Sequence, residues 1–193
     1  MKHYLNKFFC LAAFAAVSAI AAPTYEYALI DQTGKTVTQK DFPEQYQLIA
    51  FGFTHCPDVC PTTLFDFKQV LANMQQPERL QAIFITIDPH RDTPETLAKY
   101  TGYFDKRILA LGGERAAIDQ AVENFNATYG YQIDGKKAEY DNLPSDKPYV
   151  VFHSTLIYLL DKEGELLDIF DYQSGHKQLL AGIEASIAAR EQQ

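Results

Sequence analysis

Two short and almost wholly apolar runs constrain the fold of this chain more than any other feature. They span residues 47–53 (QLIAFGF) and 81–88 (QAIFITID). Runs of this kind are typical of central β-strands whose two faces are both covered by helices. Helix patterns follow each run, over residues 61–74 and 93–104. The chain is therefore predicted to be an α/β protein.

The remaining segments extend this alternation of strands and helices. The predictions are a hairpin in 25–38 turning at Gly34, a strand in 108–113, a helix in 114–130, an exposed loop or short hairpin in 132–147, a late hairpin of 154–160 and 165–170, and a closing helix in 177–190. This order matches a thioredoxin-like fold, a central mixed β-sheet flanked by helices, with an N-terminal hairpin and a loop insertion before the late hairpin. Ligands and reactive groups collect in such sheets where a central strand meets its helix.

Composition excludes some classes of function. The 193 residues are 47% apolar and 22% charged, which fits one globular domain whose core is large enough to be stable without disulfides or structural metals. The formal net charge of −8 argues against nucleic acid as a partner, because a phosphate-binding surface needs a basic excess. A protein, a small molecule or an ion is expected instead.

The N-terminal segment has the pattern of a secretory signal. Lys2 and Lys7 precede an apolar stretch over 8–20, and small residues follow it. The stretch is shorter than the roughly 20 residues of a membrane span. The prediction is a signal peptide over 1–22, with an uncleaved anchor as the alternative, and a single domain over 23–193. Either alternative places that domain in the periplasm, exported or anchored in the inner membrane facing it.

A close pair of cysteines follows the first apolar run, in GFTHCPDVCP over 52–61. If this segment is helical, Cys56 and Cys60 at i and i+4 place both sulfurs on one face of the first turn. A helix N-terminus lowers the pKa of a thiol and favours thiolate, which both metal binding and disulfide exchange require. A metal clamp, a redox-active pair and a structural disulfide are the alternatives. The disulfide is least favoured, because so short a loop constrains the unfolded chain little.

A histidine further along the chain is the candidate third ligand. His153 lies in the loop entering the late hairpin, which a thioredoxin-like fold brings beside the cysteines. Two thiolates and one imidazole form a soft set that suits Cu(I) and, after small rearrangement, Cu(II). Structural zinc normally takes four protein ligands. Copper is therefore the favoured metal.

Other polar residues near these positions have weaker predictions. Asp58 and Asp88 are expected to supply polarity around the metal site. Asp58 is also expected to cap the helix, and the alternative for Asp88 is a cap at the end of its strand. His55 is expected to flank the site, and His90 and His176 to be solvated loop residues.

Three blocks of sequence resemble the SCO/SenC proteins, assembly factors for cytochrome c oxidase. They are GFTHCPDVCPTTL, ITIDPHRDTPETLAKY and HSTLIYLLDKEGELLD, and the resemblance extends over roughly 41–189. It implies a thioredoxin-like domain that binds copper through Cys56, Cys60 and His153. The implied role is a metallochaperone rather than an enzyme, delivering copper to the dinuclear centre of oxidase subunit II. Reduction of cysteines in that subunit or in other exported proteins is the alternative. A periplasmic copper donor or a thiol reductant would be a further partner.

The chain departs from this pattern beside the histidine. Many SCO/SenC proteins have an aspartate immediately before it, where this chain has Phe152. Thioredoxins carry a cis-proline in the comparable stretch, whereas FHSTL contains none, so the histidine can approach the sulfurs.

Overall fold

Two parallel strands, β3 (Tyr46–Gly52) and β4 (Leu80–Thr86), form the middle of the computed structural model, which describes residues 23–192. They are the two apolar runs of the sequence, and they pair in register from Tyr46↔Leu80 to Gly52↔Thr86. The other strands of their sheet are β1 (Ala28–Asp31), β2 (Thr36–Thr38), β5 (Leu109–Gly112), β9 (Leu156–Leu160) and β10 (Leu166–Asp171). The seven strands lie in the order β10-β9-β3-β4-β5-β1-β2.

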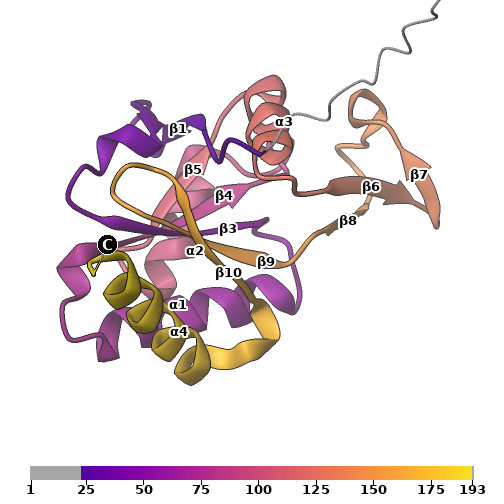
Figure 1. Cartoon of the computed structure of the whole chain (residues 1–193). Helices are drawn as coiled ribbons and strands as arrows, with labels where there is room; N and C mark the ends of the chain where they lie inside the picture. Colours follow the sequence, from indigo (N-terminus) through magenta and orange to yellow (C-terminus); the bar gives the residue numbers. More distant parts are fainter. Residues whose placement is uncertain (1–22, 193) are drawn as a thin grey trace, which may run out of the picture.

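Within residues 23–192, four α-helices cover the faces of this sheet. They are α1 (Val59–Asn73), α2 (Pro94–Phe104), α3 (Arg115–Asn124) and α4 (Gly175–Arg190). α1 and α4 lie side by side on one face, and α3 covers the opposite face near β1 (Figure 1). The predicted start of α2 is confirmed, because the Thr93 hydroxyl accepts a hydrogen bond from the Thr96 amide.

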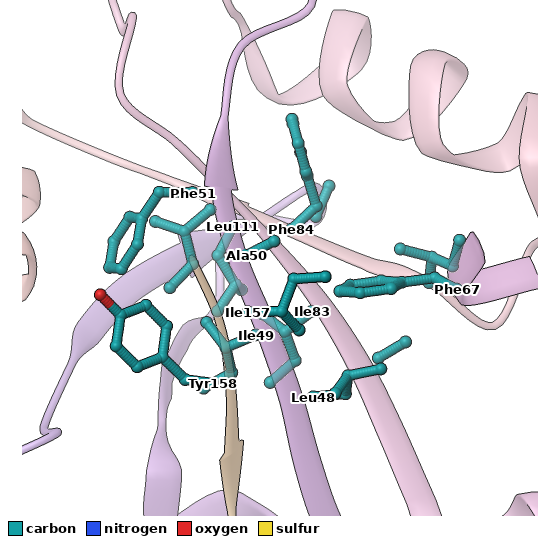
Figure 2. Packing of buried hydrophobic residues seen from close by; sticks show 14 of the residues in the cluster. Leu48, Ile49, Ala50, Phe51, Phe67, Ile83, Phe84, Leu111, Ile157 and Tyr158 are labelled. Carbon is teal, nitrogen blue, oxygen red and sulfur yellow. The ribbon is translucent and has the colours of Figure 1, made fainter. Parts of the chain in front are cut away.

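Apolar side chains pack on both faces of β3, as predicted for a central strand. On one face the rings of Phe51, Phe125 and Tyr158 meet edge to face, with centroid distances of 5.4, 6.2 and 5.0 Å. Figure 2 shows Phe51 and Tyr158 on one side of β3 and Phe67, from α1, on the other. The core therefore has two layers, one on each side of the sheet.

A second, three-stranded sheet lies beside the first. It contains β6 (Tyr129–Ile133), β7 (Lys136–Ala138) and β8 (Val150–His153), in the order β7-β6-β8. The hairpin alternative for 132–147 is thus confirmed, and Asp134 and Gly135 form its turn with φ of +51° and +75°. The helix predicted over 114–130 is wrong beyond Asn124, because Asn126 has φ of +50° and β6 begins soon after.

The architecture is the predicted thioredoxin-like fold. The hairpin at Gly34, the central strands and the late hairpin of β9 and β10 are all present. Over the described part of the chain, no helix has the length and apolar character needed to cross a membrane. The predicted leader over 1–22 lies outside the described residues.

Truncation of a central side chain tests this account of the core. Ile83 on β4 is fully buried, so Ile83→Ala should lower the free energy of unfolding by about 2–5 kcal/mol in urea denaturation. Ile169→Ala is the matched control: that side chain is 40% exposed, and its loss should change stability by about 0.5 kcal/mol or less. Equal losses would contradict the assignment of β4 to the core.

Candidate metal centre

The two cysteines lie where β3 leads into α1. The chain leaves β3 at Gly52 and turns, with the Cys56 amide donating to the Phe53 carbonyl at 3.2 Å. Cys60 lies in the first turn of α1 and is 2% exposed, whereas Cys56 precedes the helix and is half-buried. Both are free thiols.

The local geometry corrects the predicted cap and rules out a helical position for Cys56. Cys56 is not part of the helix, and its sulfur instead accepts a hydrogen bond from the Cys60 amide at 3.4 Å. Asp58 occupies the N-cap position with φ of −140°, but among the described residues its carboxylate accepts no amide hydrogen of the helix. The Cys56 sulfur therefore satisfies a free amide of the first turn, the task predicted for Asp58.

A glycine makes room for the buried sulfur. A Cβ added at Gly52 would lie 2.8 Å from the Cys60 Sγ and 2.5 Å from Cε2 of Phe84. Both distances are far shorter than ordinary contacts, so only glycine lets the sulfur pack against the end of β3.

His153 is the last residue of β8 rather than a loop residue as predicted, and it approaches the sulfurs from the second sheet. Its Nε2 lies 3.9 Å from the Cys60 Sγ, and its Nδ1 lies 2.8 Å from the Ser154 carbonyl oxygen. A proton on Nδ1, donated to that carbonyl, leaves the Nε2 lone pair facing the sulfur. A metal ion bonded to one sulfur and one imidazole holds the two about 3.6–3.8 Å apart, from typical bond lengths and trigonal or tetrahedral angles. The observed separation fits such an ion.

The three candidate ligands nevertheless do not form a complete metal site in this structure. Within residues 23–192, no three histidine, cysteine or acidic side chains already form a metal-holding cluster. The donor types of Cys56, Cys60 and His153 suit a soft metal. Closing the set around an ion requires movement of at least one of these side chains.

The two thiols titrate very differently. A hydrogen bond from the Cys60 thiol, with smaller contributions from His153 and from backbone amides, lowers the pKa of Cys56 to about 3 despite partial burial. The same hydrogen bond, together with burial, raises the pKa of Cys60 above its ordinary value. At neutral pH the pair therefore shares one proton, with Cys56 as thiolate and Cys60 as thiol.

A buried carboxylate beside the cysteine loop was missed in the sequence. Asp92 is 4% exposed and accepts hydrogen bonds from the Thr54 amide at 3.0 Å, the Thr54 hydroxyl at 2.5 Å and the Thr86 hydroxyl at 2.6 Å. Burial raises its pKa. Threonines at the ends of two neighbouring apolar strands were the available signal of a buried acceptor.

The neighbouring Asp88 is also buried, but its carboxylate is not bonded to the cysteine turn. Its carboxylate accepts hydrogen bonds from the Tyr149 hydroxyl and from Nε of Arg91, both at 2.6 Å. Arg91 in turn lies over the ring of Phe53, whose edge contacts His153. A role of Asp88 in the polarity of the metal site stays a prediction.

Three other histidines lie around the site at different depths. His55 is exposed, with Nδ1 3.1 Å from the Thr54 hydroxyl. His90 lies in a loop as predicted but is only partly exposed, and the prediction of a solvated loop residue is wrong for His176, which lies in the first turn of α4. His90 packs between the rings of Tyr140 and Tyr149, and His176 begins α4 with its ring against Phe65 and Asp66.

Phe152 does not enter the site. It is 45% exposed, and its ring lies across Gly130 of β6, where an added Cβ would be 2.5 Å from the ring. Because adjacent residues of a strand point to opposite faces, Phe152 faces away from the His153 side.

Substitution of Gly52, which makes room for the Cys60 sulfur, tests the packing of that sulfur. Gly52→Ala should lower the free energy of unfolding by about 1–3 kcal/mol, because the new methyl group overpacks against Cys60 and Phe84. Gly102→Ala is the control: a Cβ there has open space within α2, and the change should stabilise by up to about 1 kcal/mol. If both variants unfold at the same denaturant concentration, the sulfur is not seated as described.

The pH dependence of alkylation tests the thiolate. Cys56 with a pKa of about 3 is ionised from mildly acidic to neutral pH, so its reaction with iodoacetamide should be nearly independent of pH there. An unperturbed thiol would react about tenfold faster per pH unit below its pKa of about 8.5. In Cys60→Ala the hydrogen bond is lost, so the Cys56 pKa should rise and the rate at acidic pH should fall. A steep profile in the wild type would contradict the shared proton, and Cys56→Ser identifies which thiol reacts.

Comparison with known proteins places these features in a family. The SCO1/SenC family model matches residues 18–188. The human mitochondrial SCO1 homolog is 38% identical over 166 residues, which cover 84% of this chain and 50% of that protein. The chain thus spans about half the length of that relative.

Solved structures agree with this match. ScoI of Bradyrhizobium japonicum with copper bound is 34% identical, with a TM-score of 0.70 over 83% of this chain and 97% of that one. Yeast Sco1 with copper bound is 28% identical, with a TM-score of 0.77 over 87% and 90% of the two chains.

The relatives also correct the predicted location. The matching proteins of Homo sapiens, Mus musculus and Bos taurus are mitochondrial, and this finding overturns the periplasmic location predicted from the N-terminal segment. The sequence matches, the shared fold and the extent of the family match together show that this chain belongs to the SCO1/SenC family.

Proposed function

We propose that this chain is a copper metallochaperone that helps to assemble the dinuclear copper centre of cytochrome c oxidase. Cys56, Cys60 and His153 are the proposed ligands. The observation that carries the proposal is the 3.9 Å approach of His153 Nε2 to the Cys60 sulfur, because an imidazole has no required part in simple thiol chemistry. Copper-bound structures of relatives at 34% and 28% identity support the choice of metal. Oxidase subunit II is the proposed acceptor.

The three side chains suit a cargo that must be taken up and released. Cys60 and His153 are held by α1 and by the second sheet, whereas Cys56 lies in the turn before the helix and is more accessible than Cys60. Copper, as Cu(I) or Cu(II), would meet the Cys56 thiolate first. Thiolates of an acceptor protein could replace the ligands one at a time, so that the ion is never fully stripped.

The asymmetric thiol pair supports a second candidate, a thiol–disulfide oxidoreductase. The Cys56 thiolate would attack one sulfur of a substrate disulfide, forming a mixed disulfide and releasing the first substrate thiolate. Cys60 would then form the Cys56–Cys60 disulfide and release the second sulfur, giving up its proton to the products. Two electrons pass to the substrate, and an external thiol reductant must restore the pair. The hydrogen bond from the Cys60 amide to the Cys56 sulfur, which favours the thiolate and lowers its pKa, is the observation that supports this reaction.

Copper titration of the reduced protein tests the three-ligand site. His153→Ala should weaken copper binding by about 100-fold or more and remove the thiolate-to-copper absorption band, since a direct ligand contributes more than the 10–100-fold typical of its outer partners. His55→Ala is the matched control, an exposed histidine beside Cys56 that should leave affinity and spectrum unchanged. Unchanged copper binding in His153→Ala would contradict the proposed ligand set.

The same variants separate the two candidate functions. If thiol reduction is the activity, metal-free His153→Ala should still reduce a substrate disulfide, whereas Cys56→Ser should not. If copper delivery is the activity, His153→Ala should fail to metallate the soluble copper domain of subunit II.

A further inference from the structure

We infer that Asp92 is a positioning residue for the cysteine pair, acting through Thr54. The inference rests on the proposed function in one respect, that Cys56 and Cys60 are the working pair. Asp92 touches neither sulfur. It holds the turn from which Cys56 projects.

The Asp92 carboxylate joins two segments that are far apart in sequence. One oxygen accepts from the Thr86 hydroxyl at the end of β4 and from the Thr54 amide, and the other accepts from the Thr54 hydroxyl. Two of these three donors belong to one residue of the turn after β3. The exit turn of β3 is thereby fastened to the end of β4.

Asp92 is itself rigidly placed. Its backbone amide donates to the Asp88 carbonyl at 3.0 Å, and the next residue, Thr93, caps α2. Its side chain is buried, so its hydrogen bonds face little competition from water. A fixed acceptor of this kind can set the conformation of the loop that it holds.

The held turn leads directly to the reactive sulfur. Thr54 lies two residues before Cys56, and the Cys56 amide closes the turn on the Phe53 carbonyl. The Thr54 hydroxyl gives its proton to Asp92. Thr54 is bonded to Asp92, and the Cys56 amide is bonded to the Phe53 carbonyl. The turn therefore holds the Cys56 sulfur 3.4 Å from the Cys60 amide nitrogen.

This arrangement stabilises the reduced pair. The Cys60 amide donates to the Cys56 sulfur at 3.4 Å, and this bond is lost or weakened when the two sulfurs join in a disulfide. Loosening the turn should therefore destabilise the dithiol more than the disulfide. A pair whose reduced form is less stable has a lower reduction potential.

The test is the dithiol–disulfide equilibrium of metal-free protein in glutathione buffers. Asp92→Ala should shift this equilibrium toward the disulfide by about tenfold, which corresponds to about 30 mV. Asp92→Asn keeps a carbonyl oxygen to accept and an amide to donate, so it should recover most of the wild-type value. Thr54→Val removes the hydroxyl donor but keeps the amide and the shape, so it should shift the equilibrium in the same direction by a smaller factor.

Asp88→Asn is the matched control for general loss of stability. Asp88 is an equally buried carboxylate of the same loop, but it binds Tyr149 and Arg91 instead of the cysteine turn. Urea unfolding should report destabilisation of both aspartate variants, whereas only the Asp92 and Thr54 variants should move the thiol equilibrium. If Asp92→Ala does not fold, Thr54→Val decides the question.

The proposal is overturned if Thr54→Val and folded Asp92→Ala keep the wild-type equilibrium, or if Asp88→Asn shifts it equally. Because the measurement uses metal-free protein, a failure of the copper proposal leaves it unaffected.

Discussion

Parallel pairing of β3 with β4 decides where everything else can lie. The pairing runs without a break to Gly52↔Thr86, and the Ile87 amide extends it by donating to the Gly52 carbonyl at 2.9 Å. Both strands are apolar on both faces, so burial holds them in the middle of the sheet. A slip of one residue would turn every side chain of a strand to the opposite face. The register therefore brings the turn that carries Cys56 beside the loop that carries Asp92.

A third segment reaches the same edge because β9 runs antiparallel to β3. Its start, near Ile157, pairs with Ala50 at the end of β3, so the residues before β9 lie beside the cysteine turn. The chain enters β9 from β8, which belongs to the second sheet. His153 pairs with Tyr129 there, and the Ser154 amide donates to the Thr128 carbonyl at 2.8 Å. The second sheet thus fixes the backbone of the candidate histidine ligand, a task that a flexible loop would perform less accurately.

The sequence was sufficient for elements that depend on local pattern and insufficient for those that depend on distant contacts. Buried strands, the Thr93 cap and the hairpins follow from periodicity and turn residues, and they are present. β8 is only four residues long and alternates little, so its pairing with β6 was not predictable. The cap assigned to Asp58 was wrong because a sulfur four residues before Cys60 competes for the same amide. The Asp92 contact joins residues 38 positions apart, a distance over which spacing carries no information.

The same hydrogen bonds bear on both candidate functions. A thiolate held by an amide and a neighbouring thiol is a ready nucleophile and also a ready ligand, so Cys56 alone does not separate redox chemistry from copper transport. Cys60 differs, because its proton must leave before its sulfur can bind a metal. His153 is partly buried beside Cys60, with Nε2 facing the sulfur and Nδ1 bonded to a carbonyl. An imidazole in that position can supply a metal ion with a ligand beside Cys60, the sulfur that is hardest to ionise. In disulfide exchange the same imidazole makes only a minor contribution to the low pKa of Cys56. The placement of His153 is therefore the feature of this site that weighs toward metal transport.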